Sequence, residues 1–274
     1  MPVNEDIGRR MKEYYEQIPK IKLVRRMPVI IRIDGRSFHS FTKNFVRPFD
    51  DVLIKSMQET MKHLCENIQG CVLGYQQSDE ISLVLVDYKS LNSSAFFDYE
   101  VQKICSITAS MATMAFNKYY KQNIQVYNLP SSIDFMPKEK QEILINQHRT
   151  YFSKIDSAMF DSRCFNVPKE EVTNYFYWRQ LDAIRNSIQM VGQANFTHKE
   201  IQNKSCRNIE DMLLKQKGIN WNDLPIYQQR GCCCIKEEYQ NENVIRTHWT
   251  VDKGIPIFKD EGREYIDRLI FVGE

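Results

Sequence analysis

The chain has 274 residues, of which 42% are hydrophobic, and its formal net charge is +2. This length is enough to bury a substantial core, and the near-neutral charge excludes a surface that is basic all over while leaving room for one local basic surface. There is no apolar run of roughly eighteen residues and no basic segment followed by a short apolar run. We therefore expect no membrane span and no signal peptide, and we expect a cytoplasmic protein.

The first half of the chain predicts the order strand, helix, strand, strand, helix, strand. Short runs rich in Ile, Val and Leu indicate strands, and apolar residues spaced three and four apart indicate helices. A polar stretch at 128–140 predicts a loop, which a short helix follows. The predicted ranges are 28–34, 51–67, 71–76, 81–87, about 95–120, and a strand within 158–167.

The second half predicts helices followed by a hairpin. A helix is expected from Pro168 to Gly192, a second from the capping box Thr197-x-x-Glu200, and a third over 208–217, before Gly218. Strands at 231–239 and 244–252 flank a turn at 240–243. We expect a core over 1–168 and, over 169–274, a helical extension with a C-terminal β-hairpin packed on that core.

Three of the eight cysteines are consecutive, at 232–234, and none has the Cys-x-x-Cys spacing of a zinc site. The others are scattered among apolar neighbours, where a free cysteine packs as a small hydrophobic residue. We expect reduced, mostly buried thiols and assign 232–234 to a strand.

The predicted order β-α-β-β-α-β defines an α+β fold with an antiparallel sheet, the ferredoxin-like split motif. In that motif the first strand lies between the third and fourth and is antiparallel to both. Asp34, near the end of the first strand, would then lie beside Ser78, Asp79 and Glu80 in the hairpin turn. Because neighbouring strands are roughly 4.8 Å apart, Asp34 and Asp79 would share a site at one edge of the sheet.

Two carboxylates this close raise each other's pKa unless a cation lies between them. Mg²⁺ fits, because it prefers hard oxygen ligands and joins one or two carboxylates to substrate phosphates. Two Mg²⁺ ions would activate an attacking oxygen and stabilise a leaving pyrophosphate. Gly35 would let a phosphate approach the backbone. The alternative is that Asp34-Gly35 and Ser78-Asp79 are two ordinary turns.

The loop after Asp34 has groups suited to phosphate. Successive N–H groups from Arg36 to His39 would surround phosphate oxygens, and Lys43, Arg47 and Lys103 would neutralise the remaining charge.

Five segments carry a family resemblance: RIDGRSFHSFTKNFVRPFD, GYQQSDEISLVL, FDSRCFNVP, YWRQLDAIRN and INWNDLPIYQQRG. In this order, over about 26–231, the sequence resembles the tRNA-histidine guanylyltransferase family, and more closely its relatives, the guanylyltransferase-like 3′–5′ RNA polymerases. The resemblance implies a polymerase-palm core, which agrees with the predicted strand order. It also implies a homotetramer.

The resemblance implies roles for individual residues. Asp34, Asp79 and the Gly35 carbonyl would bind two Mg²⁺ ions, and Glu80 continues this catalytic carboxylate motif. Arg179 and Asn186 are candidates for tRNA contact, whereas we expect Trp178 to pack in the interior. The expected nucleotide-binding residues are Arg36, Ser37, Phe38, His39, Lys43, Phe45, Arg47, Asp50, Ser78 and Lys103.

The implied reaction uses ATP to activate a 5′-monophosphate on tRNA, after which the 3′-hydroxyl of GTP or another nucleoside triphosphate attacks the activated phosphate. The chain departs from the histidine-specific pattern at Ile184, which stands at a histidine position; a separate departure is Glu100, which stands at an arginine position and so lacks one phosphate contact that the resemblance implies. An apolar side chain cannot make the hydrogen bonds of histidine. The pattern therefore favours template-dependent repair of 5′-truncated tRNA over strict addition of one guanosine to histidine tRNA.

Two other functions stay open. A palm-type nucleotide cyclase would use the same carboxylates without RNA, but it would leave the extension without an obvious task. An RNA-binding module with the strand order of an RRM would carry aromatic residues on its central strands. The predicted strand at 81–86 has none.

Overall fold

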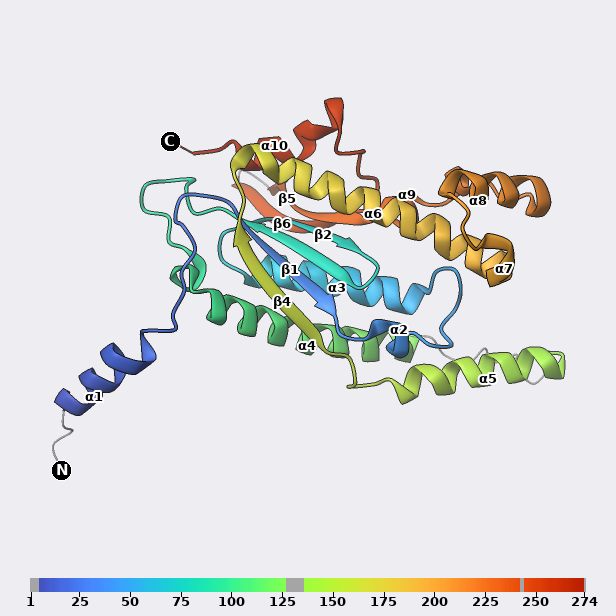
Figure 1. Ribbon diagram of the computed structural model, residues 1–274, viewed down its shortest axis with the longest axis horizontal. Coiled ribbons are helices and arrows are strands. Elements are labelled where there is room, and N and C mark those ends of the chain that lie inside the picture. The colour runs from blue at the N-terminus through green and yellow to red at the C-terminus, as the bar shows by residue number, and fades with distance from the viewer. Residues whose placement is uncertain (1–4, 127–135, 242–243, 274) are drawn as a thin grey trace.

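The computed structural model describes residues 5–126, 136–241 and 244–273, and within them a six-stranded sheet lies between two layers of helices (Figure 1). The strand order is β4-β1-β3-β2-β5-β6, and all neighbouring strands are antiparallel. The strands are β1 (Val29–Gly35), β2 (Cys71–Gln77), β3 (Glu80–Leu85), β4 (Phe160–Asn166), β5 (Cys232–Asn241) and β6 (Val244–Asp252).

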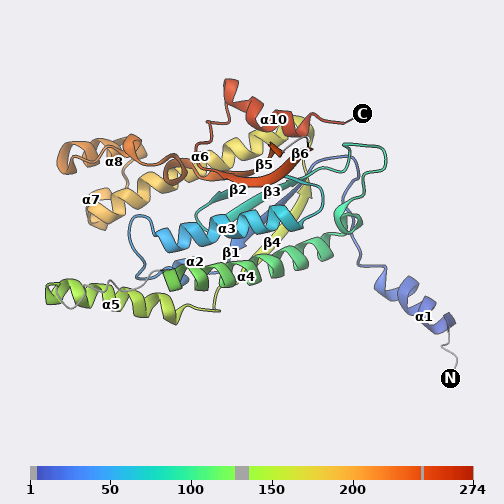
Figure 2. The ribbon, with the colours of Figure 1, turned by 180° about the vertical axis from the view of Figure 1, so that it is seen from behind.

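Different helices cover the two faces of the sheet (Figures 1 and 2). One face carries α3 (Asp51–Asn67) and α4 (Val101–Val126), and the other carries α6 (Lys169–Asn195) and α10 (Glu264–Ile270). The remaining helices are α1 (Glu5–Met11), α2 (Phe38–Phe41), α5 (Lys138–Ser153), α7 (His198–Ile201), α8 (Cys206–Met212) and α9 (Ile226–Arg230).

Alternation along β1 determines which side chains reach the site. Ile31 and Ile33 are fully buried against the layer of α3 and α4, whereas Ile30 is buried on the side of α6. Because successive side chains point to opposite faces, Arg32 and Asp34 share the side of α6 with Ile30. Polar groups near the C-terminal end of β1 thus face the helix that begins the predicted extension.

The predicted pairing of the first strand is confirmed. β1 lies between β3 and β4, and Asp34 is directly opposite Glu80 in β3 and Asp161 in β4. The C-terminal hairpin continues this sheet, because β5 pairs with β2. Cys232, Cys233 and Cys234 lie in β5 as expected and are fully buried.

The long helix predicted from about 95 begins later, at Val101. Phe97, Asp98 and Tyr99 have positive φ values, which no right-handed helix accommodates, so they form a turn that precedes α4. The predicted loop at 128–140 is partly wrong, since 138–140 already belong to α5; residues 128–135 lie outside the described part. Residues 242–243 of the predicted turn also lie outside it.

The helices of the extension largely follow the predictions. The capping box of Thr197 and Glu200 is present but begins only the single turn α7. The helix predicted for 208–217 consists of α8 and a π-helical turn over Leu213–Lys217, which ends at Gly218 with a φ of +67°.

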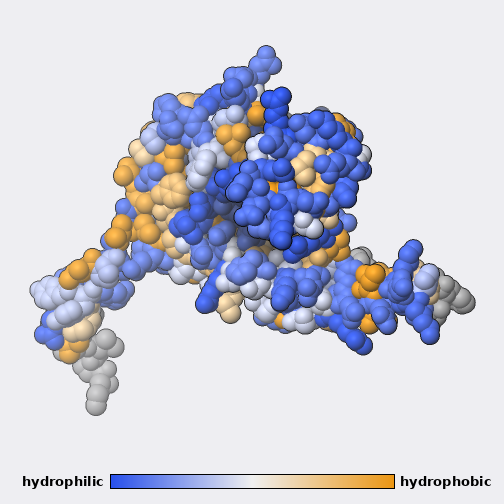
Figure 3. Space-filling view, turned by 45° about the vertical axis from the view of Figure 1, so that its right-hand side comes forward, coloured by the Kyte–Doolittle hydropathy of each residue, from blue (hydrophilic) through white to orange (hydrophobic). Residues whose placement is uncertain are grey.

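The N-terminal segment, which was included in the expected core without a predicted helix or strand, projects from the body (Figure 1). Several of its apolar side chains are exposed, among them Ile18 and Ile21. Hydrophobic surface is visible on the projecting segment in Figure 3. Within the described residues, no helix is both long enough and apolar enough to cross a membrane.

Candidate active site

The end of β1 contacts the tip of the β2–β3 hairpin. The N–H of Gly35 donates to the carbonyl oxygen of Asp79 at 3.1 Å. Ser78, at the tip, has a φ of +49°, which is uncommon for a residue other than glycine, and its hydroxyl donates to Oδ1 of Asp79 at 3.0 Å. Such backbone strain tends to occur at functional sites, and here it adjoins the two predicted metal ligands.

Both aspartates are held in an environment that disfavours their charge. Burial, followed by the negative charge of Asp161, raises the pKa of Asp34, although three nearby arginines oppose the shift. Burial, followed by the negative charge of Asp34, raises the pKa of Asp79, while hydrogen bonds from its own backbone and from Ser78 oppose it. Among the described residues, no basic group lies within 4 Å of either carboxylate. The arginines near Asp34 therefore act only from a distance, and neither carboxylate has a close basic partner among these residues.

The two aspartates and the neighbouring backbone carbonyl are the kind of ligands that usually bind Mg²⁺ in proteins. No three His, Cys, Asp or Glu side chains in the described part of the chain are arranged to hold a metal. Mg²⁺ does not need such a cage, since it keeps several waters and takes one or two carboxylates together with substrate phosphates. Asp34, Asp79 and the carbonyl of Gly35 are residues that would hold it.

Glu80, predicted as a third catalytic carboxylate, has a different environment. It is buried, and Arg179 on α6 donates to both of its oxygens, at 2.7 and 2.9 Å. Arg179 also donates to Asp182 at 3.0 Å and is itself buried. The predicted tRNA contact of Arg179 is therefore not supported, because its guanidinium is enclosed and paired. Glu80 and Arg179 act together as a link between β3 and α6.

A cavity of about 610 Å³, which we call the loop cavity, opens beside Asp79. The loop after β1 forms most of its wall, and Met190 and Gln193 of α6 form another part. Among the predicted nucleotide-binding residues, those that line it are Ser37, Phe38, His39, Lys43, Phe45, Arg47, Asp50 and Ser78.

Three of these residues mainly build the wall. The rings of Phe38 and Phe45 are almost fully buried in a group of aromatic residues beneath the loop. The carboxylate of Asp50 accepts hydrogen bonds from the N–H groups of Leu53 and Val46 and from the hydroxyl of Tyr151. Asp50 therefore caps α3 and fixes the loop, so its carboxylate is already well supplied with donors.

The backbone after Asp34 is only partly available to phosphate. The N–H of Arg36 donates to the carbonyl of Met159 at 2.9 Å, and Arg36 does not line the loop cavity. The N–H groups of Phe38 and His39 open α2, where no intrahelical acceptor exists. Of the N–H groups predicted to bind phosphate, that of Arg36 is therefore already used within the protein.

Lys103 lies away from the loop cavity. Phe160, which is opposite Gly35 in the sheet, donates its N–H to Thr113 on α4. Lys103 precedes Thr113 by ten residues, which is about 15 Å along a helix. Its ammonium instead lies 4.9 Å from the ring centroid of Phe97. The predicted phosphate contact of Lys103 is not supported within one chain.

Two further residues of α6 differ in position. Asn186 lines a second, smaller cavity beside the hairpin tip. Trp178 is 51% exposed, so the prediction that it packs in the interior is wrong.

Three residues that line the two cavities were not predicted as site residues, namely Gln77, Met190 and Gln193. Gln77 lies within the segment GYQQSDEISLVL, where its place directly before Ser78 and Asp79 was the available signal.

Asp34 near the end of β1 and Asp79 in the adjoining hairpin turn form a pair of carboxylates, and Asp79 lines a cavity with a basic loop. This arrangement is suited to transfer of a nucleotidyl group. A sequence model of the Thg1 family, described as tRNAHis guanylyltransferase, matches residues 8–168. The chain therefore belongs to this family and is a nucleotidyltransferase.

Two solved structures and a further relative are also similar to this chain. A bacterial Thg1-like protein in complex with ATP is 41% identical, with a TM-score of 0.80, and the match covers 97% of this chain and 100% of that protein. A bacterial Thg1-like protein in complex with GTP is 39% identical, with a TM-score of 0.76 and the same coverage. A probable tRNA(His) guanylyltransferase of Dictyostelium discoideum is 28% identical over 81% of this chain and 80% of its own length.

Proposed function

We propose that this protein adds nucleotides to the 5′ end of tRNA in the 3′–5′ direction, as a metal-dependent and template-dependent repair enzyme. The observation that carries this proposal is the loop cavity, which joins Asp79 to the basic loop with Lys43 and Arg47. Similar proteins in complex with ATP and GTP support nucleoside triphosphates as its ligands.

The proposed chemistry assigns positioning and charge to the chain's own groups. The first N–H groups of α2 and the side chains of Lys43 and Arg47 would bind the triphosphate. Asp34 and Asp79 would hold Mg²⁺, which when bound supplies activation of the attacking hydroxyl and stabilisation of pyrophosphate. No side chain has to act as a nucleophile, because positioning and electrostatics account for most of the catalysis of phosphoryl transfer.

The strand order β4-β1-β3-β2 supports a palm-type, ferredoxin-like core, in which the acidic pair lies at the edge of the sheet. Ile184 supports templated repair over strict guanosine addition to histidine tRNA. It packs against the apolar cluster formed by α6 and α8 and has no group that could hydrogen-bond a base.

The experiment that tests the function gives the purified protein a tRNA without its first 5′ nucleotide. The opposing base near the 3′ end is varied, and ATP and all four nucleoside triphosphates are supplied. We expect incorporation of the nucleotide that pairs with the opposing base. Guanosine incorporation opposite every base would contradict templating, and no incorporation would contradict the function itself. Cyclic nucleotide formed without RNA would support the cyclase.

We also propose a homotetramer, as the family resemblance implies. The exposed apolar side chains of the projecting N-terminal segment, such as Ile18 and Ile21, support contacts with other copies. Light scattering coupled to gel filtration should show a mass four times that of the chain. The double substitution Ile18→Asp and Ile21→Asp should lower that mass, whereas a monomeric wild type would contradict the assembly.

A further inference from the structure

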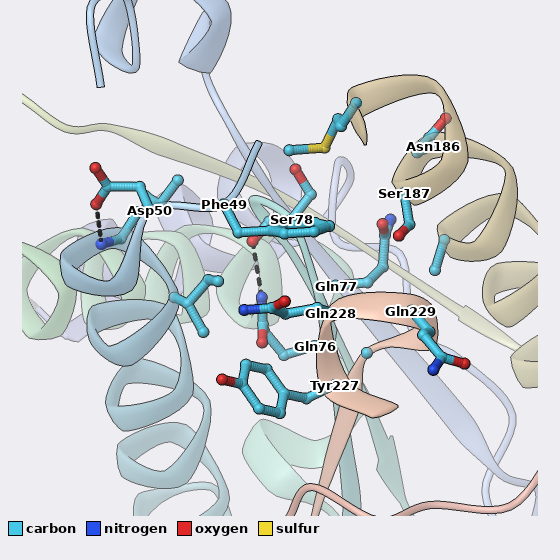
Figure 4. Close-up of a pocket in the computed structure, with 15 residues that line it drawn as sticks. Phe49, Asp50, Gln76, Gln77, Ser78, Asn186, Ser187, Tyr227, Gln228 and Gln229 are labelled. Carbon is cyan, nitrogen blue, oxygen red and sulfur yellow. Dashed lines mark hydrogen bonds between the residues drawn. The ribbon is translucent and has the colours of Figure 1, made fainter. Parts of the chain in front are cut away.

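A second cavity, of about 80 Å³, adjoins the hairpin tip and lies among β2, α6 and α9 (Figure 4). We call it the amide pocket, because Gln77, Asn186 and Gln228 line it from these three elements. It shares a wall with the loop cavity, since Asp50, Leu53, Ser78 and Met190 line both. A ligand in one cavity would therefore touch a ligand in the other.

The three amides that define the pocket have unused hydrogen-bonding capacity. Gln77 is only 7% exposed, yet among the described residues none donates to or accepts from its side chain. The same holds for the side chains of Asn186 and Gln228. In contrast, Gln76 and Gln229 in the same wall donate to backbone carbonyls. Their amide groups border the pocket and have no partner in the described protein, so they are suited to a ligand that supplies donors and acceptors.

The rest of the lining indicates which ligand that is. Phe49 and Tyr227 supply aromatic surface, and Leu53, Ile54 and Met190 supply apolar surface. Among the described lining residues, Asp50 is charged and none is Lys or Arg, so the pocket is unsuited to a phosphate. A flat ring with a polar edge matches this combination, because carboxamides pair with base edges and aromatic side chains stack on base faces.

We infer that the amide pocket is a second nucleobase site, which holds an unstacked base of the RNA end next to the nucleotide in the loop cavity. This inference rests on the proposed function, because joining two nucleotides requires both to be held side by side. Gln77 has a central role, since it directly precedes Ser78 and Asp79 and would couple the position of the base to the position of the metal ligands.

The test compares Gln77→Met, which keeps the shape but removes the amide, with Gln125→Met, a control at an exposed position of α4. Binding of a 5′-truncated, 5′-monophosphorylated tRNA is measured by fluorescence anisotropy, and binding of ATP and GTP by calorimetry. We expect Gln77→Met to weaken tRNA binding about tenfold, as for a lost amide–base contact. Binding of ATP and GTP should change by less than about twofold, and Gln125→Met should change neither.

A matched tRNA with an abasic 5′-terminal nucleotide identifies the base. The wild type should bind it about tenfold more weakly, and Gln77→Met should lose nothing further, because the same contact is removed twice. If Gln77→Met is less stable to heat, Gln228→Met at the half-buried rim takes its place. Loss of ATP or GTP binding with unchanged tRNA binding would overturn the inference, as would no effect on either. These are binding measurements, so they are separable from a failure of nucleotide incorporation by the wild type.

Discussion

The guanidinium of Arg179 donates from Nε and Nη2 to the two carboxylate oxygens of Glu80, at 2.7 and 2.9 Å. Both side chains are buried, with exposed fractions of 8% for Arg179 and 6% for Glu80. Glu80 is the first residue of β3 and directly follows Asp79. The pair therefore fastens the hairpin tip to α6, and the position of one proposed metal ligand depends on it.

Removing the arginine should destabilise the fold. Arg179→Met leaves Glu80 buried without its bidentate partner, for which a loss of about 3–5 kcal/mol is expected. Arg185→Met is the control, because Arg185 is on the same helix but is exposed and pairs with Asp182 at the surface. Its loss should be at most about 1 kcal/mol. Urea unfolding measures both values.

The same variant decides between two roles of Arg179. If Arg179→Met kept its stability and lost only tRNA affinity, the ion pair would not stabilise the fold. That result would support the predicted tRNA contact of Arg179. Adding Glu80→Gln to Arg179→Met should recover part of the lost stability, because the uncompensated charge is then removed as well.

The buried position of Arg179 follows from the helical period of the sequence. Val172 and Phe176 are apolar residues with helical spacing, and Arg179 follows Phe176 by three residues, on the same buried face. Trp178 follows Phe176 by two residues and therefore points outward. Its size favoured burial, but its place in the helical period puts it on the exposed face.

Some features could be predicted from the sequence and others could not. The strand neighbours of Asp34 were predictable from the order of elements and the alternation of side chains along a strand, because few topologies satisfy both. Periodicity does not fix how far a helix is shifted along the sheet, so the distance from Lys103 to the loop cavity was unpredictable. Nor does it show that β5 pairs with β2, since either free edge of the predicted sheet would accept a hairpin.

The paired carboxylates should be needed for activity and should oppose stability when no metal is bound. Asp34→Asn and Asp79→Asn should each lower incorporation by at least on the order of 10²–10³-fold, comparable to the loss of one key electrostatic group. Without Mg²⁺, both variants should be at least as stable as the wild type, because a pair of like charges is relieved. Thermal unfolding measures this stability.

Mg²⁺ should raise the unfolding temperature of the wild type but not of either variant, since an ion that binds only the folded state stabilises it. Asp211→Asn, at an exposed position of α8, is the control and should respond as the wild type does. An equal Mg²⁺ response in Asp79→Asn would show that the ion binds elsewhere.

Gly35 should tolerate no side chain. A Cβ there would lie 2.3 Å from the ring of Phe38, which is itself packed against Phe41, Phe116 and Phe160. Gly35→Ala should cost about 1–3 kcal/mol through overpacking and should raise the KM for the nucleotide, because Phe38 lines the loop cavity. Steady-state kinetics and urea unfolding measure both effects.

Gly8→Ala is the matched control, since a Cβ at that position meets no atom within 4 Å. It should leave the KM unchanged. If Gly35→Ala behaved like Gly8→Ala, the ring of Phe38 would be free to move, and the wall of the loop cavity would be less rigid than its packing implies.

The capping box in the extension predicts a pH effect. Hydrogen bonds from the hydroxyl and the N–H of Thr197, both at 2.7 Å, lower the pKa of Glu200. A lowered pKa means that the folded state favours the ionised form, so its contribution is present above the unfolded pKa of about 4.3 and is lost as the pH falls through the folded pKa. Glu200→Gln should therefore unfold at a lower temperature than the wild type at neutral pH and at the same temperature in acid. A gap that persisted in acid would contradict this origin.

Lys43 and Lys103, which the sequence grouped together, should differ in their effect on nucleotide binding. Lys43 lines the loop cavity, whereas Lys103 lies near the first turn of α4 beside Phe97. Lys43→Ala should raise the KM for ATP and GTP by about tenfold or more, because a charge-assisted hydrogen bond to phosphate contributes roughly 1.5–3 kcal/mol. Lys103→Ala, a substitution of the same kind at another exposed lysine, should leave both KM values within about twofold, which is less than about 0.5 kcal/mol. The reverse result would mean that the triphosphate does not lie in the loop cavity, and the position of the nucleotide would have to move toward the opposite end of the sheet.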